Sequence, residues 1–597
     1  MTKISSYILI MAAWLLSLTV NAQEDARYNK LIQEFTLNED GSSSYREYKE
    51  VKLLTHMAFH RLFGETFIIY DPENQGLKIT EAYTIMHDGK RVDVPGNAFN
   101  EVLPRNAAHA APYNSLREMV VTHTGLEVGA TIFLDYTVTS KAGYYPAFMG
   151  EVSIKDMVPV KEKQVIINIP AGEELHYKML NLRTAPEITS GDKFKTYIFT
   201  FREVKPYYQA WGVDTEALPR LFFSTAKDFA RAYFPFVAQD AFTFRISSAM
   251  AEKAGEIKGE NEGDLKTALA MQKMVVDETG TWNLDPAYIG YKCRTPEEVW
   301  ASNAGTPIEK TVLLASLLRG AGLEAVPVAI FPGKYYDEKI GSLDIFKDYA
   351  VRVKTDGSYI YLSAKHMQSQ DMAAGMNGQK AIVLDGAVES VRAFDLESHP
   401  EEIIYKVEAV LDDSLKLKAS ADILLTNGAN PYFRLYGDTA YAKRYFPGAK
   451  NAELKSMHKD KTHFVLDIEK KDAAKAYGNY CFLDLPSIPG GTNSWGYNYM
   501  EKGRQEALSL PGSVSEKYNY MITVPDGYKL ISPEVQISAK NEVGMVKISC
   551  FQDGNTISIA REITIEQDHV AFSEFGAFNE LWEAWMNPSL KTLVFKK

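Results

Sequence analysis

Two pairs of residues in the middle of the chain have types that could support hydrolytic chemistry. Cys293 and His366 could form a thiol and base pair for amide hydrolysis, in which the base activates the nucleophile. Glu309 and Asp348 could instead act as paired carboxylates that hydrolyse a glycan or a similar substrate. Spacing favours neither pair, because catalytic groups need hydrogen-bond reach that sequence separation does not reveal. The simpler interpretation of Glu309 and Asp348 is a helix-capping residue and an ordinary acid at a strand end.

The spacing of the cysteines and histidines predicts no metal site, and the sequence indicates no cofactor. The three cysteines do not have zinc-ligand spacing, and each histidine pair lacks a nearby third ligand; these residues are Cys293, Cys481, Cys550, His56, His60, His458 and His463. Cys481 and Cys550 lie in β-like stretches, where they could form a disulfide or remain two buried thiols. Neither a Gly-x-Ser-x-Gly elbow nor a phosphate-binding loop occurs.

The elements that must position the central residues follow one another between residues 303 and 362. Thr306 at the N-cap, Pro307 at the first helical position and Glu309 two residues later form a capping box that opens a helix. Gly320 ends this helix, whose apolar face comprises Leu313, Leu314, Leu317 and Leu318. An apolar strand at 325–331 and a β-hairpin at 349–354 and 359–362 follow. The predicted order is therefore helix, strand, loop and hairpin.

The segments on either side are predicted to be rich in β-strands. Between about residues 44 and 201 apolar and polar residues mostly alternate, which is typical of a β-sandwich. Helical spacing appears at 264–277 and again at 575–585, and alternation returns from about residue 402. A chain of 597 residues exceeds what one core supports. We therefore predict a multidomain α+β protein with an N-terminal β-sandwich (23–230), a central α+β domain (231–400) and a C-terminal β-rich domain (401–597).

The first residues of the chain predict the cellular compartment of the protein. Lys3 precedes an apolar run from Tyr7 to Val20, and small or tolerated residues precede a cleavage point ahead of Gln23. We expect residues 1–22 to be a signal peptide and, because no Cys follows the cleavage point, no lipid anchor. The mature protein is then expected to be periplasmic or secreted, without an integral membrane segment. A net charge of -12 and the absence of a basic run argue against a nucleic-acid partner.

The central helix and its flanks resemble a known family. The segment from Asn303 to Val328 is similar to the core helix of exported bacterial transglutaminase-like proteins, which have a papain-like catalytic fold. The segments 113–117, 125–129 and 169–172 resemble the β-rich domain that precedes this core, and 518–525 and 559–561 resemble the β-rich domain that follows it. The resemblance implies that residues 231–400 form a transglutaminase-like domain.

The resemblance also implies where a catalytic triad would lie. Active members carry a Cys nucleophile at the start of the core helix, a His on the first hairpin strand and an Asp at the end of the second. The corresponding positions here are Pro307, Asp348 and Ser363. Proline has no nucleophilic atom, aspartate is a poor base, and serine cannot stabilise an imidazolium. The resemblance therefore implies a degenerate triad without the family chemistry.

These observations lead to three alternative functions. The leading expectation is a catalytically inactive protein of the cell envelope that binds a peptide, glycan or protein partner, with Thr306, Glu309 and Asp348 as candidate cleft residues. The first alternative is a hydrolase of altered chemistry that uses carboxylates or a displaced thiol in the same cleft. The second is a structural spacer with no cleft ligand. The aromatic clusters at 207–211, 335–336 and 495–497 could line a groove, although core positions are the simpler interpretation.

Overall fold

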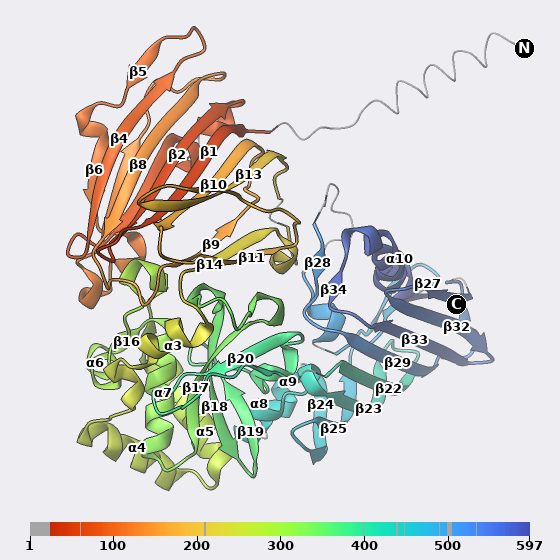
Figure 1. Ribbon diagram of the computed structural model, residues 1–597. Helices are drawn as coiled ribbons and strands as arrows, with labels where there is room; N and C mark the ends of the chain where they lie inside the picture. The colour runs from red at the N-terminus through yellow and green to blue at the C-terminus, as the bar shows by residue number, and fades with distance from the viewer. Residues whose placement is uncertain are drawn as a thin grey trace, which may run out of the picture.

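The computed structural model describes residues 24–597 apart from positions 60, 208, 209, 398, 438, 439, 447, 489, 498–503, 505 and 533. The predicted signal peptide, residues 1–22, lies outside the described residues. The rest of the chain forms sheet-rich regions before and after a central region that holds most of the helices (Figure 1). The predicted multidomain, sheet-rich α+β class is confirmed.

An eight-stranded sheet dominates the N-terminal region. Its strand order is β12-β13-β10-β1-β2-β8-β4-β5, and β1 and β10 are parallel whereas the other neighbours are antiparallel. Alternate side chains are buried along its strands, as the sequence pattern predicts for a sheet with one covered face. The strands are β1 (Ala26–Leu37), β2 (Ser43–Leu53), β4 (Gln75–Ile85), β5 (Arg91–Asp93), β8 (Thr131–Ser140), β10 (Val160–Pro170), β12 (Glu187–Ser190) and β13 (Phe194–Val204).

Two short sheets cover this long sheet. One has the order β3-β7-β6 and the other β11-β14-β9, and the second lies between the long sheet and the central region (Figure 1). Each packs its buried side chains against the long sheet in a separate apolar cluster. Their strands are β3 (Glu65–Tyr70), β6 (Phe99–Val102), β7 (Arg117–Thr122), β9 (Met149–Ser153), β11 (His176–Leu180) and β14 (Arg220–Ser224).

The central region packs helices on a five-stranded sheet of order β19-β18-β17-β20-β21. The predicted helix, strand and hairpin are present as α7 (Pro307–Gly320), β17 (Ala325–Pro332), β18 (Asp348–Thr355) and β19 (Ser358–Leu362). Every α7 residue from Ile308 to Leu318 is buried, because the helix lies between the sheet and α4, α5 and α6. The other elements are α3 (Phe229–Val237), α4 (Ser248–Glu260), α5 (Asp264–Glu278), α6 (Pro296–Ser302), β20 (Gln379–Val383), β21 (Phe394–Asp395) and the short pair β15 (Gly280–Thr281) and β16 (Ala304–Gly305).

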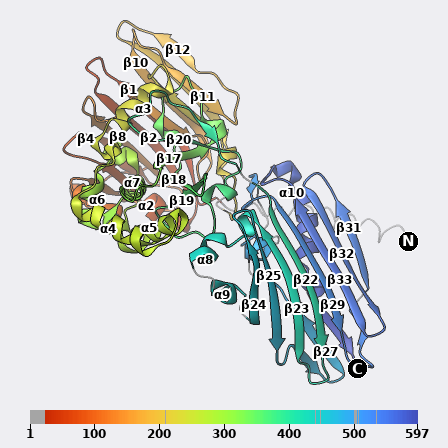
Figure 2. The same ribbon diagram turned by 90° about the horizontal axis from the view of Figure 1, so that it is seen from below.

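The C-terminal region contains a second eight-stranded sheet, of order β24-β25-β23-β22-β29-β33-β32-β31. Figure 2 shows these strands side by side. Strands β22 (Glu401–Leu411) and β29 (Val514–Thr523) are parallel, and the rest of the sheet comprises β23 (Leu417–Thr426), β24 (Ala449–Met457), β25 (Lys461–Lys470), β31 (Val535–Lys540), β32 (Gly544–Asp553) and β33 (Thr556–Ile565). The predicted C-terminal helix is α10 (Phe575–Met586). A small sheet accompanies it, made of β26 (Ala474–Tyr477), β27 (Tyr480–Asp484), β30 (Lys529–Leu530) and β35 (Thr592–Lys596).

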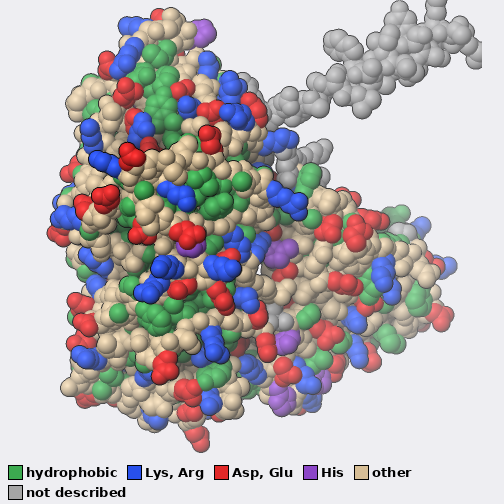
Figure 3. All heavy atoms as spheres, viewed as in Figure 1, with side chains coloured by type: hydrophobic (Ala, Val, Ile, Leu, Met, Phe, Trp, Pro, Cys, Tyr) green, Lys and Arg blue, Asp and Glu red, His purple; other side chains and the backbone are tan. Residues whose placement is uncertain are grey.

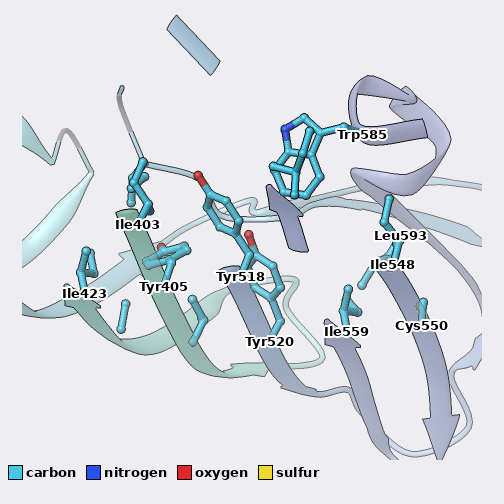
Figure 4. Close-up of a cluster of buried hydrophobic side chains, with 14 of the residues drawn as sticks. Ile403, Tyr405, Ile423, Tyr518, Tyr520, Ile548, Cys550, Ile559, Trp585 and Leu593 are labelled. Atoms are coloured by element: carbon cyan, nitrogen blue, oxygen red, sulfur yellow. The ribbon is translucent and has the colours of Figure 1, made fainter. Parts of the chain in front are cut away.

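Aromatic side chains fill the space between this sheet and α10. Tyr405 lies 5.8 Å from Tyr518 and 6.0 Å from Tyr520 between ring centroids, and Trp585 of α10 lies 5.8 Å from Tyr518 (Figure 4). These ring separations are those of favourable edge-to-face and tilted contacts. Cys481 and Cys550 are both free thiols, so the disulfide alternative is wrong. The C-terminal region is therefore held by packing.

No helix among the described residues combines the length and the apolar character needed to cross a membrane. On the face seen in Figure 3, acidic and basic side chains are interspersed over all three regions.

The segment between β13 and β14 contacts the C-terminal region through one ionisable pair. His569 Nδ1 lies 3.1 Å from Asp214 Oδ2, beside a backbone hydrogen bond from Asp214 to Ala507. The hydrogen bond to Asp214 raises the pKa of His569 above its usual 6.5. The protonated form of His569 is therefore favoured in the folded protein.

This pair predicts a pH dependence of stability. A raised His pKa stabilises the folded protein below pH 6.5, and this contribution is lost as the pH rises through the folded-state pKa. Because the pair is partly exposed, we expect its loss to cost less than about 1 kcal/mol. Thermal unfolding from pH 5.5 to 9 should therefore show a smaller decline in His569→Gln than in the wild type. His463→Gln, at a pair with Asp422 within one sheet, is the matched control; equal slopes in the wild type and His569→Gln would contradict the prediction.

Candidate functional site

A pocket of about 170 Å³ lies at the start of α7. It contains two of the three predicted triad positions, Pro307 and Asp348, and also the predicted cleft residue Thr306. Apolar rings and three lysines complete its wall, which comprises Phe236, Leu284, Pro286, Ile289, Tyr291, Lys292, Thr306, Pro307, Ile308, Phe346, Lys347, Asp348, Tyr349 and Lys365. Thr306, Pro307 and Asp348 therefore share one pocket wall, most of which the sequence did not indicate.

Pro307 occupies the first position of α7, where a nucleophile would gain most from the helix N-terminus. The capping box that the sequence predicts is present. Thr306 Oγ1 accepts a hydrogen bond from the Glu309 backbone at 3.4 Å, and Glu309 Oε2 accepts one from the Thr306 backbone at 2.8 Å. Proline has neither an N–H donor nor a nucleophilic atom, so this position stabilises the helix and offers no reacting group.

Asp348 is the first residue of β18 and is engaged in an ion pair. Its Oδ1 atom accepts hydrogen bonds from Lys365 Nζ at 2.6 Å and from the Tyr349 backbone at 2.8 Å. Both side chains of the ion pair are about one third exposed. The Asp348 carboxylate is thus already bound by a lysine and a backbone amide. Lys365 was not identified from the sequence, because only the turn after β19 brings it back to β18.

Ser363 lies directly after β19 and is fully buried. Its Oγ accepts hydrogen bonds from the Lys365 and His366 backbones at 3.1 and 3.4 Å, and its carbonyl accepts one from Gln272 Nε2 at 2.8 Å. Ser363 is not part of the pocket wall. It therefore shapes the turn that carries Lys365 toward Asp348.

Glu309 is fully buried and does not line the pocket. Its carboxylate accepts a hydrogen bond from Tyr113 Oη, a second from the Thr306 backbone and three from Arg294, through the backbone at 3.0 Å, Nε at 3.0 Å and Nη2 at 3.0 Å. Arg294 also lies over the Trp282 ring, with Cζ 4.8 Å from its centroid. This saturated carboxylate joins the N-terminal region, the loop before α6 and the start of α7, and it has no free capacity to act as an acid or base.

The displaced thiol and histidine do not form a pair. Cys293 Sγ lies 3.9 Å from the Arg294 carbonyl, and burial together with nearby Glu309 raises the pKa of the thiol well above its usual value. His366 Nδ1 lies 3.4 Å from Ser363 Oγ. Among the described residues, no hydrogen bond connects Cys293 to His366. A thiol in this setting stays protonated, which disfavours nucleophilic attack.

A larger cavity, of about 730 Å³, adjoins the pocket. The two share the wall residues Pro286, Tyr291, Phe346, Lys347 and Tyr349. The cavity extends from the central region to the strands of the N-terminal sheets, and its volume is within the range of about 300–1,000 Å³ that is usual for ligand sites. It is therefore the larger part of the candidate site, and it was not predicted, because it forms only where distant segments meet.

The aromatic clusters noted in the sequence lie elsewhere. Trp211 and Trp495 line a separate pocket of about 320 Å³ beside Glu401, and Tyr497 packs in the C-terminal core. Tyr335 is buried in the central core, and Tyr208 lies outside the described residues. In the part of the chain that the structure describes, no group of three His, Cys, Asp or Glu side chains could hold a metal ion.

Two family models match parts of the chain, and a solved structure is similar along nearly its whole length. Residues 39–208 match DUF3857, described as a domain of unknown function with a solved structure, and residues 479–595 match the similarly described DUF3858. A crystal structure of a "putative protease" from Parabacteroides distasonis is 28% identical, with 96% of this chain and 99% of that chain covered and a TM-score of 0.73. It therefore shares the multidomain, sheet-rich architecture along nearly the whole chain. No curated protein matches the chain.

Two further structures are more remote. A "putative cysteine protease" from Cytophaga hutchinsonii is 12% identical, covers 41% of this chain and 84% of its own, and has a TM-score of 0.20. An M1 zinc metallopeptidase from Deinococcus radiodurans is 15% identical, covers 34% of this chain and 42% of its own, and has a TM-score of 0.18. Neither likeness bears on the fold or the activity of this chain.

Proposed function

We propose that this chain is a catalytically silent protein of transglutaminase-like fold that binds a peptide, glycan or protein partner in the cell envelope. The observation that carries the proposal is the pocket at the start of α7, where Pro307 occupies the nucleophile position and Asp348 is paired with Lys365. In this proposal the chain is exported after loss of residues 1–22, and its domains are 23–230, 231–400 and 401–597.

Two observations support the transglutaminase-like part of the proposal. A helix packed on an antiparallel sheet, followed by a strand and a hairpin, is the arrangement that the resemblance implies for the core. The similar structure from P. distasonis is described as a "putative protease", which fits a hydrolase-like ancestry for the core. The proposal keeps the scaffold and the pocket and assigns them to binding.

The contacts of Glu309 count against the competing hydrolase. A carboxylate pair would need Glu309 beside the pocket with a free oxygen, but both oxygens already accept hydrogen bonds from Arg294. A displaced thiol would need a lowered pKa at Cys293, and burial raises it instead.

Hydrolysis assays test the proposal. We expect the purified protein, Asp348→Asn and Cys293→Ala to give the same background with labelled casein and with a panel of peptide amides, scored by new amino groups and released ammonia. The reason is that the pocket contains no activated nucleophile. Cys550→Ala, at a free buried thiol in the C-terminal sheet, is the matched control for Cys293→Ala. Turnover that disappears in Asp348→Asn or Cys293→Ala and persists in Cys550→Ala would refute catalytic silence.

A further inference from the structure

The two short N-terminal sheets cover the same face of the long sheet. Phe35 of β1 is opposite Tyr45 of β2, which is opposite Val138 of β8, so the three residues form one cross-strand row. Phe35 packs in the cluster that contains β9 and β14, whereas Tyr45 and Val138 pack in the cluster that contains β3 and β7. The two short sheets therefore lie next to each other over one floor.

The 730 Å³ cavity lies between facing edges of these short sheets. Residues 67–69 of β3 and 149–152 of β9 line it, over a floor formed by residues of β1, β2 and β8. Strands β3 and β9 are each the terminal strand of their sheet. The cavity is therefore bounded on two sides by strand edges.

We propose that this cavity binds an extended peptide that pairs with the edges of β3 and β9 and takes the place of a strand between them. This inference rests on the proposed binding function and names its ligand class. Strand edges offer backbone donors and acceptors that recognise a peptide main chain, while pockets for alternate side chains supply specificity. A glycan has no such main chain, so the strand edges favour a peptide.

The opposite walls of the cavity differ in chemistry and specify the two faces of the peptide. The floor carries the rings of Phe35, Tyr45 and Tyr136, which suit apolar side chains. The roof comes from the central region and carries the carboxylates of Asp285 and Asp344. A peptide with alternating apolar and other side chains would present one set to each wall.

The roof carboxylates specify basic side chains. Asp285 accepts a hydrogen bond from the Ala287 backbone at 2.9 Å, and Asp344 accepts one from Tyr291 Oη. The one lysine in the wall, Lys347, lies 2.5 Å from Glu151, and Glu151 also pairs with Arg220. Among the described residues, neither Asp285 nor Asp344 forms an ion pair through its carboxylate. A lysine or arginine of the peptide would supply the missing countercharge, with aromatic rings alongside.

Fluorescence anisotropy with three labelled heptapeptides tests this proposal on the full mature chain. The first peptide alternates Lys and Val, the second replaces each Lys with Glu, and the third is the first with N-methyl groups on alternate amides. We expect the first to bind and the other two to bind at least about tenfold more weakly, because they lose the charge match or the strand donors. Failure of the first peptide to bind at millimolar concentration, or equal binding of the N-methylated peptide, would overturn the proposal.

Matched variants locate the binding site. The double variant Asp285→Asn, Asp344→Asn keeps acceptors for the Ala287 amide and the Tyr291 hydroxyl but removes both charges, and we expect about a tenfold or larger loss of affinity for the basic peptide. Asp192→Asn, on an exposed turn between β12 and β13, should bind like the wild type. Equal affinity of the double variant and the wild type would place the peptide elsewhere and overturn the assignment.

Two further readouts separate this inference from the proposed function. Mass spectrometry of the recovered peptide should find it intact; cleavage would refute catalytic silence and leave the groove assignment standing. Cellohexaose serves as the glycan probe. Binding of cellohexaose without binding of the basic peptide would overturn the peptide assignment and leave the proposed binding function standing.

Discussion

Glu309→Ala is expected to lower the free energy of unfolding by about 3–5 kcal/mol, which is the usual cost of removing one partner from a buried ion pair. The substitution leaves Arg294 with its charge in a largely buried setting, removes the acceptor of the Tyr113 hydroxyl and opens the capping box of α7. Urea unfolding followed by tryptophan fluorescence measures the change, since Trp282 packs against both Tyr113 and Arg294.

Glu298→Ala is the matched control for this prediction. Glu298 occupies the same capping-box position at the start of α6, where it accepts a hydrogen bond from the Thr295 backbone at 2.8 Å but is exposed. Its loss should cost about 1 kcal/mol, which is typical of a helix cap. If Glu309→Ala cost no more than Glu298→Ala, Glu309 would be only a cap, and the contacts to Arg294 and Tyr113 would contribute little.

Raising the pH is expected to stabilise the protein through Lys310. This side chain is 1% exposed, and its Nζ donates to the Thr279 carbonyl at 2.6 Å and to Thr281 Oγ1 at 3.0 Å. Burial lowers the pKa of Lys310 from 10.5 to about 8. The unfolded chain then binds more protons between pH 8 and 10.5, so this residue makes the unfolding free energy rise with pH, by up to about 3 kcal/mol.

The difference between variants isolates this effect from other titrating groups. Unfolding of the wild type and of Lys310→Met should be compared at pH 7, 8.5 and 10, and the advantage of Lys310→Met should shrink as the pH rises. Lys258→Met is the control, because Lys258 also donates to a backbone carbonyl, that of Ala321 at 2.6 Å, but is exposed. A constant difference between the wild type and Lys310→Met across this range would show that Lys310 keeps its ordinary affinity for protons.

The part of the site that the sequence predicted is the part set by near neighbours. The capping box of Thr306 and Glu309 depends on residues three apart, and the hairpin of β18 and β19 depends on the turn between them, so both could be inferred. Neighbouring residues alone could not show whether the carboxylate oxygens of the cap residue Glu309 are free or already accept hydrogen bonds from distant residues. Arg294 lies 15 residues from Glu309, and Tyr113 lies 196 residues away.

The cavity likewise could not be predicted from the sequence, because it depends on contacts between distant segments. Alternation in the sequence predicted strands in the N-terminal region, but a strand edge and a strand face have the same alternating pattern. Only the pairing of strands shows that β3 and β9 end their sheets, and only tertiary packing places Asp285 and Asp344 over them. The sequence therefore directed attention to the smaller pocket.

The contact between Tyr113 and Glu309 has a consequence for biosynthesis. The strands from β1 to β13 are all made before Glu309 leaves the ribosome, and Tyr113 precedes its acceptor by 196 residues. At about 5–20 residues per second, synthesis of that interval takes about 10–40 s. The N-terminal sheets can thus form while Tyr113 still lacks its partner. The start of α7 would then dock on a surface that already exists, so the order of synthesis favours folding of the N-terminal sheets before the core.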